Sequence, residues 1–401
     1  MKNKTKKTLT NTILSIAVLV IVFGLGYKIG QYRSPFTVGS GFANFGTMNF
    51  SLFWETYNDL KQKYVDNKKL NDQTLYYGAI KGMTAAIGDP YTFFMTPSEN
   101  QQSKQDLEGK FDGIGAQLGL KDNRIVIVAP LKNSPAEKAG IKSGDLIDKV
   151  DGVSTASWTL SQAVNKIRGA KGTKVTLTIG RNGKDFDVTI TRDEIVVPSV
   201  ELSFKNNVAY LKLNQFGDTT NQEWDKAVTQ IASKWKNKEI KGMILDLRDN
   251  PGGYLESAVY LASDLLPKGS LVVKQESANP GESQNYYVDR QGRLTDIPLV
   301  VLINQGSASA SEILSGAIRD YKRGKLVGEK SFGKGSVQEA LDLSNGAGLH
   351  VTVAKWVLPN GDWINGKGIE PDIKIANPTD NSNTVTEATD AQLQKAFDLL
   401  K

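Results

Sequence analysis

Three serines lie in a run of small residues, NQGSASASEIL, which follows an apolar stretch. A serine hydroxyl becomes a nucleophile when a neighbouring group takes its proton, but serine is also common at the start of a helix. Ser309 and Glu312 fit the capping pattern S-x-x-E. The positive end of the same helix would also stabilise an oxyanion. Both roles stay open for Ser309, and spacing alone does not distinguish it from Ser307 or Ser311.

A serine nucleophile needs a base, and histidine is the most common one. The single histidine, His350, lies in GLHVTVAKW, whose alternation predicts a half-exposed strand and a surface role. The nucleophile motif G-x-S-x-G does not occur in the sequence. These features argue against a Ser-His-Asp enzyme.

Lysine is the remaining common base, and GEKSFGKGSVQEA offers one. Lys334 lies between Gly333 and Gly335, and Gln338 follows four residues later, on the same face of a predicted strand. The Gln338 amide could then hold the Lys334 amine in place. A lysine accepts a proton from serine only when neutral, which requires burial or a positive neighbour to lower its pKa. The flanking glycines would let neighbouring backbone segments approach closely and enclose the Lys334 amine. The alternative interpretation is that Lys334 is an exposed lysine in a turn.

Composition argues against several other kinds of site. The chain has no cysteine, which excludes disulfides, cysteine nucleophiles and thiolate metal sites. One histidine leaves little for a metal centre, so we expect neither a metal nor a cofactor. Residues from Gly328 to Lys334 nearly match the phosphate-binding loop, but Gly335 stands where that motif has a hydroxyl residue. Nucleotide binding is therefore not expected.

The net charge of the chain is concentrated at its N-terminus. The formal charge is +6, and residues 1–34 hold six basic residues and no acidic one. The remainder is neutral, so we expect no nucleic-acid partner. Four lysines precede a nearly unbroken apolar run from Ile13 to Tyr27. This pattern predicts a single-pass signal anchor in a bacterial cell membrane, with everything after about Arg33 outside the cytoplasm; cleavage near Gly24 would give a secreted form.

Two helical regions are expected outside the central part of the chain. Residues 35–103 are helical in pattern, with Phe53, Tyr57 and Leu60 on one face. Residues 379–401 contain a second helical pattern with an apolar face. Both faces need cover, which suggests a homodimer built from them.

The middle part, residues 104–193, resembles a PDZ domain. FDGIGAQLGL is followed by APLKNSPAEKAGIKSGDLIDKVDG, then by an amphipathic helix at Leu160 to Ile167 and by GAKGTKVTLTIGR. A lone G-x-G would indicate only a turn, but the order of these segments supports the resemblance. In that fold the loop offers N–H groups to a peptide's terminal carboxylate, and the peptide is added as a strand. The resemblance assigns this binding to Gly113, Ile114, Gly115 and Ala116.

Residues 194–378 alternate strand and helix, which predicts crossover units and a largely parallel sheet. Over nearly its whole length the chain closely resembles the bacterial C-terminal processing peptidases, or tail-specific proteases. Besides the PDZ-like part, the matching stretches are YVDNKKLNDQTLYYGAIKGM, GDPYTFF, LDLRDNPGGYLESAV, NQGSASASEILSGAIRD, GEKSFGKGSVQ and NGKGIEPDI. The resemblance implies an α/β fold with a ClpP/crotonase-like peptidase core, an inserted PDZ domain and a helical N-terminal region.

The resemblance also assigns roles to the residues of the site. It implies that Ser309 is the nucleophile, Lys334 the general base and Gln338 the orienting amide, and so it selects one of the three serines. The implied oxyanion donors are the backbone N–H groups of Gly253, in RDNPGGYL, and of Ala310. Without the resemblance, NPGG would indicate only a turn.

The function implied is a membrane-anchored serine endopeptidase that recognises apolar C-terminal tails of protein substrates through its PDZ domain. Arg168, between the PDZ helix and its GAKGT turn, is the candidate for coupling that domain to the active site. The competing interpretation is a PDZ scaffold or binding protein with an inactive peptidase part. A scaffold would need neither Ser309 nor Lys334, and their joint presence with Gln338 favours the enzyme.

Overall fold

The computed structural model describes residues 49–121, 124–131, 133–377 and 389–401. The predicted signal anchor lies outside these residues. Among the helices that are described, none is long and apolar enough to cross a membrane. The chain divides into two compact units, residues 1–75 and 76–401.

The first unit contains a helix with an uncovered apolar side. Helix α2 (Ser51–Lys63) is followed by the short 3₁₀ helix η1 (Asn67–Lys69), and helix α3 (Asp72–Ala85) begins near the unit's end. Within the described residues, α2 has no buried side chain, and Trp54 is 57% exposed. An uncovered aromatic surface of this kind is typical of a contact with another molecule.

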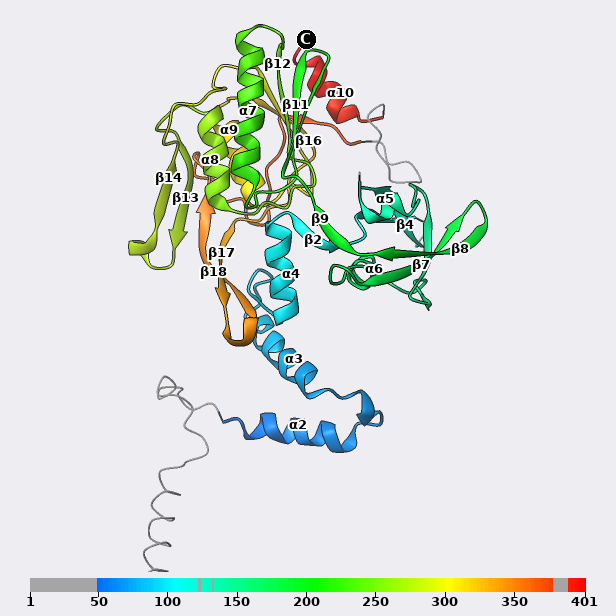
Figure 1. The fold of residues 1–401 in the computed structure, drawn as a ribbon. Helices are drawn as coiled ribbons and strands as arrows, with labels where there is room; N and C mark the ends of the chain where they lie inside the picture. The colour runs from blue at the N-terminus through cyan, green and yellow to red at the C-terminus, as the bar shows by residue number, and fades with distance from the viewer. Residues whose placement is uncertain (1–48, 122–123, 132, 378–388) are drawn as a thin grey trace, which may run out of the picture. The chain divides into compact units, whose positions relative to one another are not determined.

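A six-stranded, mostly parallel sheet forms the centre of the second unit (Figure 1). The first two strands form an antiparallel hairpin, and every later pair is parallel. The strand order is β10 (Val200–Lys205), β11 (Val208–Leu213), β12 (Gly242–Asp246), β15 (Leu299–Ile303), β16 (Lys325–Gly328) and β19 (Ile373–Lys374). Strands β12 and β15 are buried at every position, as expected for strands covered on both faces.

Helices cover the two faces of this sheet. Successive side chains of a strand point to opposite faces of its sheet. Along β15, Val301 belongs to the apolar cluster on one face and Val300 to the apolar cluster on the opposite face. Helices α7 (Thr220–Lys236), α8 (Leu255–Leu265) and α9 (Ala310–Asp320) contribute to the first cluster, and α10 (Ala391–Asp398) to the second (Figure 1). Phe397 of α10 is buried against this sheet. The expectation that the C-terminal helix needs a second chain to cover its apolar face is therefore wrong, because the chain's own sheet covers it.

A second, antiparallel sheet contains a long hairpin, which is formed by the strands β17 (Ser336–Asp342) and β18 (Gly348–Val357). The path of this sheet is β1 (Phe93–Met95), β18, β13 (Leu271–Ser277) and β14 (Gln284–Tyr287), and β17 also pairs with β18. The remaining 3₁₀ helices are η2 (Pro280–Glu282) and η3 (Ser344–Gly346). Helix α4 (Pro97–Leu107) is joined to this hairpin, because Asn100 and Lys104 both donate hydrogen bonds to Asp342 at the end of β17.

A third sheet lies in the segment that resembles a PDZ domain. Its strands are β3 (Ala116–Lys121), β4 (Arg124–Pro130), β5 (Leu146–Val150), β7 (Lys174–Arg181) and β8 (Lys184–Thr191), with β6 (Val153–Ser154) beside β5. Helix α5 is short (Pro135–Lys138), and α6 spans Leu160–Ile167 as the sequence pattern predicts. The strands β2 (Lys110–Gly113) and β9 (Asp193–Val196) pair where the chain enters and leaves this part. Ile127 and Leu177 lie in its separate apolar core.

Candidate active site

The structure distinguishes the three serines that precede helix α9. Ser307 Oγ donates a hydrogen bond to the Leu247 carbonyl at 2.8 Å, and Ser311 Oγ donates to the Asn250 carbonyl at 3.0 Å. Both serines are fully buried. Ser309 is only partly buried, and its backbone has φ 54° and ψ −117°, a conformation rarely adopted by residues other than glycine. Of the three, Ser309 is the one whose hydroxyl a substrate can reach.

The loop after strand β12 lies directly against Ser309. Ala308 N–H donates to the Asn250 carbonyl at 3.0 Å. A Cβ atom added to Gly252, whose φ is +99°, would lie 2.7 Å from the Ser309 Cβ. A Cβ atom on Gly253 would lie 2.1 Å from the Phe216 carbonyl oxygen. Both glycines are therefore required by close backbone approach, which a turn motif alone does not indicate.

Two backbone N–H groups near Ser309 remain available as donors. Gly252 N–H donates to the Asn250 side chain at 2.9 Å. In the described part of the chain, neither Gly253 N–H nor Ala310 N–H donates a hydrogen bond. Ala310 lies in the first turn of α9, where N–H groups lack helical partners and the helix dipole is positive. These are the two donors that the resemblance implies for an oxyanion.

Lys334 lies in the loop between β16 and β17, and other backbone encloses it. A Cβ atom on Gly333 would lie 2.8 Å from the Gly368 nitrogen, and one on Gly335 would lie 2.7 Å from the Asn365 nitrogen. The Lys334 amine lies 5.3 Å from the centroid of the Tyr91 ring. It has no hydrogen-bond or ion-pair partner among the residues that the structure describes.

The surroundings of Lys334 favour its neutral form. Burial lowers the pKa of Lys334 below its ordinary value, while the negative charges of Asp89 and Glu312 act in the opposite direction. The effect of burial is the larger one. A lowered pKa increases the fraction of neutral amine at neutral pH, which is what a general base requires.

Glu312 joins the serine to the lysine loop. Its carboxylate is fully buried, and one oxygen accepts hydrogen bonds from Ser309 N–H at 2.9 Å and Lys334 N–H at 3.0 Å. The other oxygen accepts from Ser331 Oγ at 2.5 Å and from Gly333 N–H at 2.7 Å. Burial raises the pKa of Glu312, and these hydrogen bonds offset the rise only in part. The capping pattern identified Glu312 as a partner of Ser309, but no sequence signal indicated its contacts with the lysine loop.

Among the described residues, no hydrogen bond joins the Gln338 side chain to the Lys334 amine. Gln338 Nε2 donates to Ser336 Oγ at 2.8 Å and to Thr352 Oγ1 at 3.1 Å. The spacing argument assumes that Lys334 and Gln338 lie on one strand. Strand β17 begins only at Ser336, so Lys334 lies in the preceding loop and not on that strand.

His350 has a packing role on strand β18. Its ring is half-buried and lies 4.8 Å from the Phe93 ring, centroid to centroid. Burial lowers the pKa of His350, and the nearby charge of Lys334 adds to this effect. Within the described ranges, no group of three or more histidine or acidic side chains could hold a metal ion.

The residues expected to bind a peptide lie at an open sheet edge. Gly113 ends β2, and Ala116 begins β3. Gly115 has φ +70°, and a Cβ atom there would lie 2.5 Å from the Ser134 Cβ, so the loop requires glycine. Ile114 between them is buried. Strand β3 pairs only with β4 among the described strands, which leaves the edge that an added peptide strand would use.

Arg168 connects the helix beside this edge to helix α4. It is the C-terminal cap residue of α6, and its guanidinium forms an ion pair with Asp106 of α4 at 3.0 Å. Two residues earlier in α4, Lys104 forms an ion pair with Asp342 of β17 at 2.7 Å. Helix α4 therefore links α6 to the strand that carries Gln338.

Two family models match the chain: peptidase family S41 over residues 207–375 and the PDZ domain over residues 126–181. "Probable CtpA-like serine protease" of Staphylococcus haemolyticus is 41% identical over 329 residues, which are 82% of this chain and 65% of that protein. "Carboxy-terminal processing protease CtpA" of Bacillus subtilis is 39% identical over 372 residues, which are 92% of this chain and 76% of that protein.

The chain spans 64% to 66% of the length of four staphylococcal relatives. Among solved structures, the photosystem II D1 C-terminal processing protease is 29% identical with a TM-score of 0.51, over 83% of this chain and 95% of that one. The expected α/β peptidase fold with a PDZ domain and a helical N-terminal region is confirmed. On these matches and this fold, the chain belongs to peptidase family S41, among the relatives of the carboxy-terminal processing proteases.

Proposed function

We propose that the chain is a serine endopeptidase with Ser309 as its nucleophile and Lys334 as its general base. The observation that carries this proposal is the buried carboxylate of Glu312, which binds the backbone N–H groups of both residues through one oxygen. The incomplete burial of Ser309 and the lowered pKa of Lys334 support it further. An inactive scaffold would have no use for a rare backbone conformation at Ser309 or for a lysine with a lowered pKa.

The proposed mechanism is acyl transfer in two steps. Neutral Lys334 takes the proton of Ser309 Oγ as this oxygen attacks the scissile carbonyl carbon, and the lysine then gives that proton to the leaving amine. Lys334 next takes a proton from a water molecule as this water attacks the acyl carbon, and it returns that proton to Ser309 Oγ when the bond between this oxygen and the acyl carbon breaks. Gln338 orients the lysine amine. The N–H groups of Gly253 and Ala310 bind the oxyanion, and each donor of this kind contributes roughly 3 kcal/mol.

The proposed substrates are proteins with apolar C-terminal tails. The loop from Gly113 to Gly115 would bind the terminal carboxylate, and the tail would pair with β3. Leu118 of β3 and Leu160 of α6 are only partly buried members of the PDZ core, which favours an apolar tail between them. We propose that Arg168 couples the binding of a tail to the strand that carries Gln338, through helix α4.

Two further proposals concern the cell and the assembly. The apolar run from Ile13 to Tyr27 would anchor the chain in the cell membrane with the peptidase outside the cytoplasm, and protease protection in intact cells tests this against a secreted form.

The uncovered helix α2 would form a homodimer. Sedimentation tests this proposal: the unsubstituted chain should be a dimer, and Trp54→Glu should make it a monomer. A monomer in the absence of the substitution would contradict the proposal.

The first prediction concerns the catalytic pair. Ser309→Ala and Lys334→Ala should each reduce cleavage of an unfolded protein with an apolar C-terminus by roughly a thousandfold or more, because each removes a reacting group. Lys330→Ala and Ser98→Ala are the controls, since both residues are exposed or half-exposed outside the site. Equal cleavage by all four variants would refute the Ser-Lys mechanism.

The second prediction concerns pH. The kcat of cleavage should rise with pH as Lys334 loses its proton, with a midpoint below the ordinary pKa of lysine, since burial lowers the pKa of Lys334. Asp89 raises this pKa by favouring the ammonium, so Asp89→Asn should move the midpoint to lower pH. The other titratable groups that face the amine, Glu312, Tyr91 and His350, remain unchanged in this variant.

Glu339→Gln is the control for the pH profile, because this exposed carboxylate is not among the charges that act on Lys334. Its midpoint should equal that of the unchanged chain. A midpoint that moves to higher pH in Asp89→Asn would contradict the assignment of the rising limb to Lys334.

The third prediction concerns Glu312. Glu312→Gln keeps the size of the side chain but turns one acceptor into a donor, which leaves buried N–H groups of the lysine loop without partners. Such groups cost about 1 to 3 kcal/mol each. Amide hydrogen exchange at Gly333 and Lys334 should accelerate, and cleavage should fall by roughly tenfold or more. Unchanged exchange in this loop would show that Glu312 does not hold it.

The fourth prediction concerns Arg168. Arg168→Ala should leave the affinity for a free apolar C-terminal peptide unchanged but reduce the effect of that peptide on cleavage, because the link to α4 is broken. Arg124→Ala is the control, since it removes an ion pair of the PDZ sheet with Asp148. If both the rate and its dependence on the peptide are unchanged in Arg168→Ala, the coupling proposal should be abandoned.

A further inference from the structure

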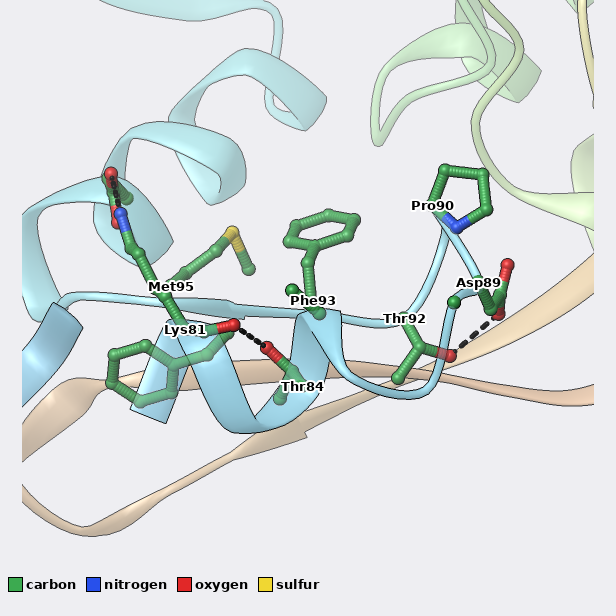
Figure 2. A pocket seen from close by; sticks show the side chains of 11 residues that line it. Lys81, Thr84, Asp89, Pro90, Thr92, Phe93 and Met95 are labelled. Atoms are coloured by element: carbon green, nitrogen blue, oxygen red, sulfur yellow. Dashed lines mark hydrogen bonds and ion pairs between the residues drawn. The ribbon is translucent and has the colours of Figure 1, made fainter. Parts of the chain in front are cut away.

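The segment between α3 and β1 reaches the hairpin that carries Gln338. Asp89 of this segment is half-buried, and its carboxylate accepts three hydrogen bonds. The donors are Thr352 Oγ1 at 2.5 Å, Thr92 Oγ1 at 2.7 Å and Tyr91 N–H at 3.0 Å. Figure 2 shows the bonded pair Asp89 and Thr92 among the residues that line a pocket of about 690 Å³. Thr352 belongs to β18, which is far from Asp89 in sequence.

Thr352 extends this contact to the proposed catalytic amide. It lies opposite Gln338 in the register of β17 and β18. Gln338 Nε2 donates to Thr352 Oγ1 at 3.1 Å, and Thr352 Oγ1 donates to Asp89 Oδ2 at 2.5 Å. A continuous hydrogen-bond chain therefore runs from Gln338 through Thr352 to Asp89.

Asp89 sets the direction of this chain. Burial acts to raise the pKa of Asp89, but the hydrogen bonds from Thr352, Thr92 and Tyr91 and the charge of Lys334 hold it below its ordinary value. The carboxylate is therefore ionised at neutral pH, and an ionised carboxylate only accepts hydrogen bonds. The single hydroxyl proton of Thr352 must point to Asp89, so its oxygen can only accept from the next group.

The same logic determines which end of the Gln338 amide faces Thr352. The amide has a donor end, Nε2, and an acceptor end, Oε1. Because the Thr352 oxygen and Ser336 Oγ both accept from Nε2, this end is engaged twice. The Oε1 end remains as the acceptor that Gln338 can offer to another group.

We propose that Asp89 is a positioning residue that acts through Thr352 to orient the Gln338 amide, so that its oxygen accepts a hydrogen bond from the Lys334 amine during catalysis. This rests on the proposed peptidase function. A neutral amine has two N–H bonds and one lone pair. An acceptor for one N–H turns the lone pair towards the proton of Ser309. The Lys334 amine has no hydrogen-bond partner among the described residues, so this contact forms only when the catalytic arrangement is reached.

The test is a double-mutant cycle on kcat, measured at the pH plateau where Lys334 is neutral. Thr352→Val removes the hydroxyl at constant shape and should lower kcat by roughly tenfold with KM unchanged. In a Gln338→Ala background it should change kcat by less than about twofold, because its only route to the lysine is absent. Thr352→Ser should recover most of the lost rate.

Asp89→Asn supplies a donor that can reverse the chain, so it should lower the plateau kcat as Thr352→Val does. It should also move the pH midpoint, which Thr352→Val leaves in place because no charge is removed. Thr178→Val is the matched control, since it removes a threonine-to-aspartate hydrogen bond of 2.6 Å in the PDZ sheet. An unchanged plateau kcat in Thr352→Val, or its full effect in the Gln338→Ala background, overturns the proposal.

The two proposals fail in different ways. If no Ser309-dependent cleavage exists, the peptidase function is wrong, and the hydrogen-bond chain is tested by NMR instead. The side-chain amide resonance of Gln338, identified by its loss in Gln338→Ala, should shift in both Thr352→Val and Asp89→Asn. A resonance that stays unchanged in either variant overturns the positioning role of Asp89.

Discussion

The site depends on one buried carboxylate. Glu312 is fully inaccessible to solvent, and a charge in such a place is tolerated only when hydrogen-bond donors surround it. Four donors do so, and they come from the start of the serine helix and from the lysine loop. The two loops therefore cannot separate without exposing a charge to an apolar interior. This constraint keeps Ser309 and Lys334 together even though they are distant in sequence.

The parallel sheet brings these loops to one edge. Strands β12, β15 and β16 are neighbours, and the segments that leave their carboxyl ends carry Gly253, Ser309 and Lys334 respectively. Carboxyl ends of adjacent parallel strands meet at the same edge, where sites in such sheets commonly form. Arg248 strengthens this edge, because it is largely buried and pairs with Asp246 and with Asp390 before α10. The C-terminal helix thus helps to hold the end of β12.

The second sheet connects this arrangement to helix α4 and to the PDZ part. Its hairpin carries Gln338 and Thr352, and helix α4 contacts the hairpin through Lys104 and contacts Arg168 through Asp106. The ion pair of Arg168 with Asp106 is partly exposed, and such pairs contribute about 1 kcal/mol or less to stability. A contact of this strength contributes little to the fold. It is suited to the proposed coupling, in which it would form or break when a peptide binds beside α6.

The sequence by itself determined the local features: the α/β alternation, the amphipathic helix Leu160–Ile167, and a helix beginning within the serine run. These follow from periodicity and capping among residues a few positions apart. Only the tertiary structure decided that Ser307 and Ser311 are hydrogen-bonded to carbonyls some 60 residues away, that Glu312 holds the lysine loop, and that Lys334 lies in the loop before the strand that carries Gln338. Hydrogen bonds between distant segments depend on how strands pair and where that pairing is interrupted, and no local pattern records either.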